Sequence, residues 1–516
     1  MKSLFGKTIA LIPAAVIALS MAGCSESFMD DINKDEDHAT DVEAKFMVPQ
    51  LELLTAQNVV GGDFNTYFGA YVEHWTGTHN QLWNVENRMG QERAATTFNN
   101  SWQNVYEVIR NAKIVVEKCT TTEPDNLLSK AIGEIIQAYA AAVATDVFGD
   151  TPYSQTGDYK NYMNPELDKQ EDIYKDVMAL LDDAIKSLES ASNTLQGYDF
   201  IYGGDAAKWT KFAYGLKARY TMRLIARSSD KAADYNKIIE YVDKSFASAS
   251  EQATLNVYDG INQNPTFDFQ WSRDGISSSK SMFLKLTERN DPRAEMAYVH
   301  SGEWFTIPVD EVMDYLPENG NCIQTQYEHA YDYSSMAEIA GVHLLSYHEV
   351  LFLKAEALAR LNRTDESKAV LKSAIAAGMA NFVENLDAAL NSPTLLGYGG
   401  LEAPEKTDIS AEDIDGYFES AVVPLFDANP VKEVMIQKYI AFWGANGEST
   451  ECYNDVRRLK ALKEDIYSLA NPNKDKFPLR GPYGTDDTSS NPHVKEAYGN
   501  GMYVYSEPVW WAGGTR

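Results

Sequence analysis

The residues best suited to binding chemistry stand in one short run, from Tyr71 to Arg88. Indole rings alternate there with amide and imidazole groups, namely Trp75, His79, Asn80, Gln81, Trp83 and Asn84. A pyranose presents an apolar C–H face that stacks on an indole, and hydroxyl groups that pair with amides. Covering ~80 Å² of that face contributes ~2 kcal/mol. Because the run lacks the apolar spacing of a helix, we predict an irregular loop that binds a sugar.

A second set of aromatic residues lies between residues 248 and 344, a stretch rich in Gly, Asn, Asp, Ser and Tyr. Three of them are further candidates for ligand contact: Trp304, Tyr331 and Trp271. For all these residues, Trp75 and Trp83 included, the alternative is a place in the hydrophobic core. Trp102 and Trp209 fall on the apolar faces of predicted helices, so we expect both to be buried.

Several patterns resemble catalytic motifs but are incomplete. Gly61-Gly62-Asp63-Phe64 is similar to a cyclic-dinucleotide synthase signature, yet Asn65 follows where that motif needs a carboxylate. His348-Glu349 begins like a zinc-protease helix, but Phe352 stands where the second histidine ligand would be. The sequence has neither a phosphate-binding glycine loop nor a serine nucleophile elbow. With 75 acidic residues, a carboxylate pair suited to glycoside hydrolysis can always be proposed, so such a pair does not distinguish an enzyme from a binding protein. We therefore predict no enzymatic activity, no catalytic residue, no cofactor and no metal site.

The amino terminus has the features of a bacterial lipoprotein signal peptide. Lys2 and Lys7 precede an apolar run from Thr8 to Leu19, which is too short to anchor a protein across a bilayer. Met21-Ala22-Gly23-Cys24 then resembles a lipobox, in which the Cys24 thiol carries the lipid. Several acyl chains at ~0.8 kcal/mol per buried CH₂ hold a protein stably at a membrane. The alternative is a secreted protein with a cysteine there by chance.

These features divide the amino-terminal region into two parts. We predict a signal peptide over residues 1–23 and a lipidated acidic tether over residues 24–40, followed by a single domain over residues 41–516. No later stretch is expected to reach membrane-spanning length, so the membrane contact is through the lipid anchor alone.

The net charge and the cysteine content argue against nucleic-acid binding, a disulfide framework and a zinc site. With 45 basic and 75 acidic residues the net charge is -30, which argues against binding nucleic acid and favours a neutral or cationic ligand. The same acidity also serves solubility. Beyond Cys24 the sequence has Cys119, Cys322 and Cys452, whose odd number and wide spacing favour buried free thiols over a disulfide framework or a zinc site, although one pair could bridge.

Helical periodicity organises most of the remaining chain. Four stretches have apolar residues at three- and four-residue steps: Trp102–Val116, Leu128–Val147, Ile173–Leu188 and Trp209–Tyr220. Periodicity resumes from Leu344 to Ile375, with a turn at Asn362-Arg363-Thr364, and again from Val434 to Phe442. Helix pairs of about 30–35 residues predict a mostly α-helical, tetratricopeptide-like scaffold. Residues of about 60–98 and 248–344 are then insertions with long irregular loops and a few short strands, such as Trp304–Ile307.

A family resemblance is carried by ordered segments. In chain order they are Phe148-Gly149-Asp150-Thr151-Pro152-Tyr153 with Gln170-Glu171-Asp172-Ile173-Tyr174, Gly203-Gly204-Asp205 with Trp209, Leu216-Lys217-Ala218-Arg219, Asn290-Asp291-Pro292-Arg293, Glu349 with Ala355-Glu356-Ala357, Gln437-Lys438-Tyr439, and Asp455-Val456-Arg457-Arg458-Leu459. Together, behind a lipobox, they resemble the SusD/RagB family of nutrient-binding outer-membrane lipoproteins over essentially the whole mature chain.

The resemblance implies a SusD-like fold and a role as a lid. Members of that family cap a TonB-dependent barrel transporter, the SusC-like partner, and hold a glycan or a peptide outside the outer membrane. An oligosaccharide ligand follows from adding the aromatic run to this resemblance. Two alternatives stay open: the same lid role with a peptide ligand, and a helical-repeat adaptor that binds only protein.

Overall fold

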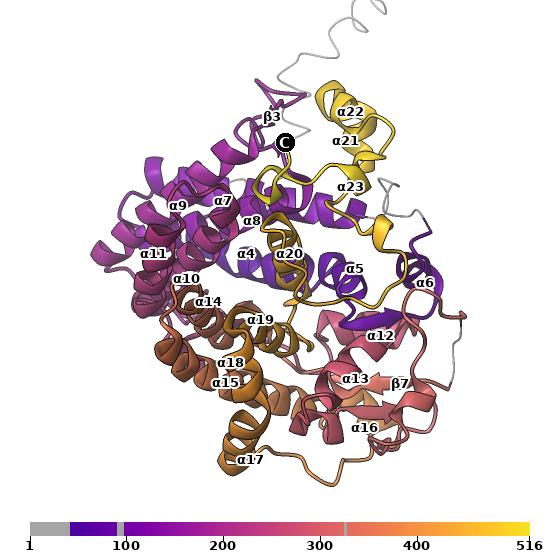
Figure 1. The fold of residues 1–516 in the computed structure, drawn as a ribbon. Coiled ribbons are helices and arrows are strands. Elements are labelled where there is room, and N and C mark those ends of the chain that lie inside the picture. The colour runs from indigo at the N-terminus through magenta and orange to yellow at the C-terminus, as the bar shows by residue number, and fades with distance from the viewer. Residues whose placement is uncertain (1–41, 90–97, 325–327) are drawn as a thin grey trace, which may run out of the picture. The chain divides into compact units, whose positions relative to one another are not determined.

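Long helices form where apolar residues recur at helical spacing, and each packs on its neighbour along the chain (Figure 1). The computed structural model describes residues 42–89, 98–324 and 328–516. The scaffold helices are α7 (Asn99–Thr121), α8 (Leu127–Phe148), α9 (Gln170–Ser190), α10 (Ala206–Arg223), α11 (Lys231–Asp243), α14 (Tyr347–Arg360) and α15 (Thr364–Leu390). In this order, each helix contacts the next, with α11 against α14. The predicted mostly helical fold is confirmed.

Residues 44–516 form one compact unit. The predicted signal peptide, Cys24 and the acidic tether lie outside the described residues. Within the unit, Cys119, Cys322 and Cys452 are buried free thiols, as expected. Trp102 and Trp209 are also buried, in agreement with their places on apolar helix faces.

Helix α8 lies at the centre of the scaffold, between α7 and α9. The Asn126 side chain accepts a hydrogen bond from the amide of Ser129 at its start, and the helix ends at Gly149, whose φ is 74°. By length and composition alone α8 could cross a membrane, so the expectation that no later stretch reaches that length was wrong. Most of its side chains are buried inside the fold, so α8 is a core helix of this unit.

Capping side chains set the start of the other scaffold helices. Asp205 accepts hydrogen bonds from the amides of residues 207 and 208 at the start of α10. Ser346 caps α14 through the amide of Glu349, at 3.1 Å. The helix predicted from Leu344 therefore begins at Tyr347, because residues 342–345 pair as a strand instead.

Shorter elements surround the scaffold. The remaining α-helices are α4 (Val48–Leu54), α5 (Asp63–Tyr71), α6 (Asn80–Glu86), α12 (Pro265–Arg273), α13 (Lys280–Thr287), α16 (Pro393–Gly397), α17 (Ala411–Tyr417), α18 (Val423–Ala428), α19 (Pro430–Ala441), α20 (Ser449–Ala461), α21 (Thr485–Ser490), α22 (Pro492–Tyr498) and α23 (Tyr503–Ser506). Antiparallel strand pairs join β1 (Trp75–Gly77) to β5 (Ile276–Ser278), β2 (Thr151–Pro152) to β3 (Leu167–Asp168), β4 (Ala253–Leu255) to β8 (Val342–Leu345), and β6 (Tyr298–His300) to β7 (Ala330–Asp332).

Two regions predicted as irregular are more ordered than expected. The run from Tyr71 to Arg88 contains β1 and α6, because Leu82 and Val85 are buried and give α6 an apolar face. The described part of residues 248–344 contains α12, α13, the strands β4 to β7 and most of β8. The predicted strand at Trp304–Ile307 is wrong, since only Thr306 forms an isolated bridge there.

Candidate ligand-binding site

Three aromatic side chains from separate segments gather at the surface: Trp271, Trp304 and Tyr398, which we call the aromatic platform. The ring centroid of Trp271 lies 5.4 Å from that of Tyr398 and 6.3 Å from that of Trp304. The corresponding interplanar angles are 54° and 50°. Trp271 is 38% exposed and Tyr398 is 70% exposed, while Trp304 is half-buried. The platform therefore offers adjoining apolar rings that are tilted rather than coplanar.

Helix α12 positions Trp271 close to its carboxyl end. The Asn264 side chain fixes the start of the helix, where it accepts from the amide of Thr266 at 2.9 Å and donates to the carbonyl of Ala340 at 2.9 Å. One turn before Trp271, the buried ring of Phe267 stacks under it, with centroids 5.9 Å apart and planes 9° apart. The tryptophan thus rests on a rigid apolar base.

A tight turn after β6 positions Trp304. Its φ is 59°, a left-handed conformation that costs a non-glycine residue about 1–3 kcal/mol. Two hydrogen bonds hold the turn. The backbone amide of Trp304 donates to the carbonyl of His300 at 3.0 Å, and the indole N–H of Trp304 donates to the carbonyl of Ser301 at 3.2 Å. The amide of Glu402 donates to the Trp304 carbonyl at 2.9 Å, which ties this turn to the segment that carries Tyr398.

Tyr398 follows α16, at a turn that needs glycine. Its amide and that of Gly400 both donate to the carbonyl of Leu395, at 2.8 and 2.9 Å. Gly399 and Gly400 have φ values of 107° and 78°, which favour glycine. The chain reverses after α16, and Tyr398 is left exposed beside Trp271.

A buried carboxylate fastens α16 to the loop that precedes α12. Glu338 accepts hydrogen bonds from the hydroxyl of Ser392, from the amide and hydroxyl of Thr394 at 2.8 and 2.6 Å, and from the Gln263 amide group at 2.7 Å. Burial raises the pKa of Glu338 and these hydrogen bonds lower it, with a net shift downward. The carboxylate therefore stays ionised and keeps two of the three platform segments in register.

A polar hollow with a cavity volume of about 260 Å³ also borders α12. Side chains able to pair with sugar hydroxyls line it, among them Gln57, Asn58, Asn100, Asn104, Ser272 and Arg273. Burial raises the pKa of Asp63 in this hollow, while a hydrogen bond from Asn100 and the charge of Arg273 lower it. The apolar rings and the hydrogen-bonding groups that carbohydrate recognition requires thus both lie on or beside this helix.

Trp75 is buried in the core rather than exposed for ligand binding. It is only 2% exposed, and its indole N–H donates to the carbonyl of Thr66 at 3.0 Å. A Cβ on Gly69 would lie 2.1 Å from its ring, so the indole is packed directly against the backbone. The prediction that Trp75 stacks on a sugar is wrong, because β1 places it in the core.

Helix α6 carries the other candidates of the same run. Asn80 is exposed, while His79, Gln81, Trp83 and Asn84 are half-buried. The indole N–H of Trp83 donates to the carbonyl of Cys322 at 2.9 Å, and His79 lies 2.9 Å from the amide nitrogen of Gln324. Trp83 and His79 thus contact the 322–324 segment.

Tyr331 supports the site from beneath. It is 7% exposed, on β7, and its hydroxyl donates to Asp274, the residue that caps α12. Tyr331 therefore fixes the end of the helix that carries Trp271, and its predicted contact with ligand is wrong.

Tyr398 was missed by sequence reasoning. It lies in a polar insertion between two helical segments, far in sequence from both tryptophans. A possible signal was a tyrosine directly before Gly399 and Gly400, outside any apolar repeat. Such a residue has no helix face to cover and is free to be exposed.

Several segments on which the family resemblance rests form buried ion pairs. They are Arg219 with Glu349 at 2.6 Å, Arg293 with Asp291 at 2.6 Å, Lys438 with Asp455 at 2.7 Å, and Arg458 with Glu356 at 2.7 Å. Each side chain in these pairs is 5% exposed or less. The motifs thus serve the scaffold rather than the ligand.

Comparison with known families and structures gives a consistent result. The profile of a SusD-like family, described as starch-binding and associating with the outer membrane, matches residues 37–483. A SusD/RagB family protein from Bacteroides thetaiotaomicron is 43% identical, with a TM-score of 0.88 over 92% of this chain and 100% of that one. The comparison with curated proteins found no match.

More distant structures share the fold. A chitin-binding protein is 21% identical with a TM-score of 0.66, over 91% of this chain and 100% of its own. A SusD homologue from Bacteroides fragilis is 17% identical with a TM-score of 0.69, over 92% of this chain and 100% of its own.

Proposed function

The chain belongs to this SusD-like family of glycan-binding proteins associated with the outer membrane, and we propose that it captures an oligosaccharide and delivers it to a SusC-like TonB-dependent barrel transporter, for which it acts as the lid. The observation that carries the proposal is the aromatic platform, in which Trp271 and Tyr398 expose neighbouring rings to solvent. Family members bind rather than transform their ligands, so the role proposed is capture without chemistry.

The tilt between the rings favours a bent glycan over a flat one. Planes 50° and 54° apart cannot all lie against a flat ribbon of sugar units, but they can follow a chain that curves. With ~2 kcal/mol for each stacked face, and after the costs of association, we expect affinities of roughly millimolar to micromolar. Binding of this strength suits a lid that must also release its ligand.

A glycan titration tests the proposal. We expect a curved α-1,4-linked glucan such as maltoheptaose to bind, and chitohexaose to bind more weakly. Replacement of Trp271 or Tyr398 by alanine should weaken binding by about tenfold or more, because each removes one stacking face. The matched control is Tyr159→Ala, which removes an equally exposed tyrosine, 73% against 70%, outside the platform. If both platform variants bind the glycan as tightly as the unchanged protein, the site assignment is wrong.

The same proposal includes the anchor. Cys24 is the proposed lipidation site, and the acidic tether that follows would hold the domain at the cell surface. Membrane fractionation and protease treatment of intact cells test this: Cys24→Ala should release the protein from the outer membrane. Unchanged membrane retention of that variant would contradict a lipid anchor.

Partner and ligand class can be tested together. Detergent extracts of the tagged protein should contain a barrel transporter, and an extract without one would contradict the lid role. If no glycan binds but peptides co-purify with the protein, the ligand is a peptide and the lid role stands.

A further inference from the structure

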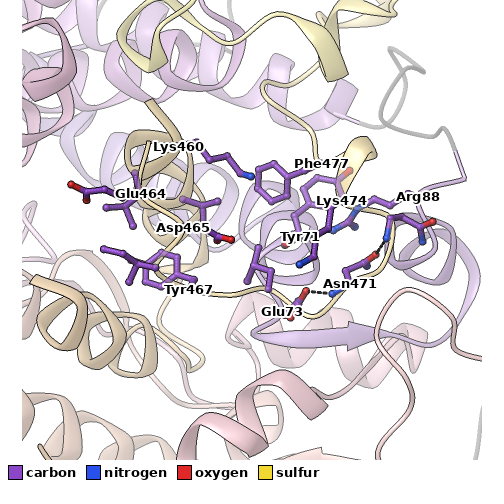
Figure 2. Close-up of a pocket in the computed structure, with 15 residues that line it drawn as sticks. Tyr71, Glu73, Arg88, Lys460, Glu464, Asp465, Tyr467, Asn471, Lys474 and Phe477 are labelled. Atoms are coloured by element: carbon purple, nitrogen blue, oxygen red, sulfur yellow. Dashed lines mark hydrogen bonds between the residues drawn. The ribbon is translucent and has the colours of Figure 1, made fainter. Parts of the chain in front are cut away.

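A second pocket lies away from the aromatic platform, between α20 and the chain that follows it (Figure 2). Its cavity volume is about 70 Å³. Three aromatic side chains line it, namely Tyr71, Tyr467 and Phe477, and aliphatic groups such as Leu459, Ile466 and Leu469 complete its apolar wall. The pocket is thus shaped to receive a ring with an apolar face.

Three cationic side chains contribute positive charge to the lining of this pocket. Arg88, Lys460 and Lys474 line it, and among the described residues none of the three has a carboxylate within ion-pair distance. Arg88 lies 4.6 Å from the Tyr71 ring centroid, and Lys460 lies 5.0 Å from that of Phe477. Figure 2 shows Arg88 and Lys474 at one end of the pocket and Tyr467 at the other.

The acidic residues of the pocket are mostly engaged elsewhere. Both carboxylate oxygens of Glu73 accept hydrogen bonds from the backbone amides of residues 470 and 471, at 2.8 and 2.7 Å. Glu464 is paired with Arg360, at 3.0 and 2.8 Å. Asp465 is the remaining carboxylate of the lining, and it is exposed. With Glu464 balanced by Arg360, three cations lie against the two carboxylates Glu73 and Asp465, which leaves one net positive charge in the lining, in a chain of net charge -30.

Buried polar atoms without partners point to a ligand as well. Arg88 is 2% exposed and donates to the carbonyls of Val85 and Tyr71 through its two terminal nitrogens, at 2.8 and 3.5 Å. Within the part of the chain that the structure describes, its Nε and the hydroxyl of Tyr467 have no hydrogen-bond partner. Buried polar groups are rarely left unsatisfied, so these two atoms give the pocket wall hydrogen-bonding capacity that a bound molecule can use.

From these observations we propose that the pocket binds a small aromatic carboxylate, with its ring between the aromatic walls and its carboxylate toward Lys460, Lys474 and Arg88. A carboxylate gains from several cations in a partly enclosed site, and a flat ring gains from stacking and from release of water. This site is independent of glycan capture at the platform.

Calorimetric titration of the full-length mature protein with 4-hydroxyphenylacetate tests the proposal, with the neutral 4-hydroxyphenylacetamide and with glucuronate as comparison probes. We expect saturable binding of the acid, and binding at least about tenfold weaker for the amide. Glucuronate, which has the charge without an aromatic ring, should also bind more weakly. Raising the salt concentration should weaken binding of the acid.

Variants at the exposed lysines keep the buried structure intact. Lys460→Met combined with Lys474→Met should weaken binding of 4-hydroxyphenylacetate by about tenfold. Lys476→Met removes the same kind of charge two residues away, outside the lining, and should leave binding unchanged. Trp271→Ala should also leave it unchanged, which separates this site from the platform. No binding of the acid, equal binding of acid and amide, a preference for glucuronate, or an equal loss in Lys476→Met would overturn the proposal.

Discussion

The guanidinium of Arg458 holds the carboxylate of Glu356 through two hydrogen bonds, at 2.7 and 2.8 Å, across 102 residues of sequence. Both side chains are 1% exposed or less. Arg458 also bonds Asp455 at 2.8 Å, and Asp455 pairs with Lys438 at 2.7 Å. This network joins α14, α19 and α20 inside the fold.

Breaking this network should be costly. In Glu356→Gln the buried Arg458 keeps only Asp455, which it shares with Lys438, so the buried cations exceed their anions and we expect the free energy of unfolding to fall by about 3–5 kcal/mol. Urea unfolding measures the change. Glu366→Gln is the control, because its pair with Arg363 is exposed to solvent, and its unfolding midpoint should hardly move. Equal losses in the two variants would contradict the reasoning.

Replacing Trp75 should reduce stability, whereas replacing Trp271 should mainly reduce glycan binding. Trp75→Ala empties a packed core position and should cost about 3–5 kcal/mol of stability. Trp271→Ala should cost much less stability but should weaken glycan binding, since the side chain is partly exposed on the platform. Thermal unfolding and glycan titration of both variants check this contrast. A Trp75→Ala protein of unchanged stability would contradict its place in the core.

Glu86 should make stability fall as the pH rises. Burial raises its pKa to about 7, with Arg88 lowering and Glu73 raising it. Because the folded pKa lies above the unfolded value, its contribution is complete below about 4.5 and is lost as the pH rises through about 7. Glu86→Gln should remove this slope and should stabilise the protein by about 3 kcal/mol at pH 8. Urea midpoints between pH 5 and pH 8 measure it; parallel curves for the two proteins would refute it.

His74 should act in the opposite direction. Burial lowers its pKa to about 3, against hydrogen bonding to the Tyr439 carbonyl, so the folded protein holds it neutral. Its contribution to stability is present above the unfolded value of about 6.5 and is lost as the pH falls toward 3. His74→Gln should therefore flatten the acid limb of the stability curve. Acid denaturation followed by circular dichroism checks this, and an acid limb as steep as in the unchanged protein speaks against it.

Gly149 should resist substitution more than Gly197 does. Its φ is 74°, and a Cβ there would lie 2.6 Å from the Arg480 guanidinium and 2.9 Å from the carbonyl oxygen of Arg516. Gly197 has a φ of 91° but nothing within 4 Å of such a Cβ. Gly197→Ala should cost about 1 kcal/mol from backbone strain alone, and Gly149→Ala clearly more. Chemical unfolding of both variants measures the difference, and equal costs would show that the clash is relieved.

The sequence by itself determined the helical scaffold and the family. The spacing of apolar residues and the helix end at Gly149 specify α8 locally, and the order of the motifs that carry Glu356 and Arg458 indicates the family. Both signals are readable without a structure, since periodicity and motif order are properties of the chain alone.

Only the tertiary structure decided which aromatic residues face the solvent. Trp75 lies in a run of residues suited to sugar binding, but it is buried. Its strand pairs with Ile276–Ser278, about 200 residues further along the chain. Trp271, Trp304 and Tyr398 come together through a turn, a helix end and a glycine pair that no local pattern connects. Exposure depends on what packs against a side chain, and those contacts are set by chain segments remote in sequence.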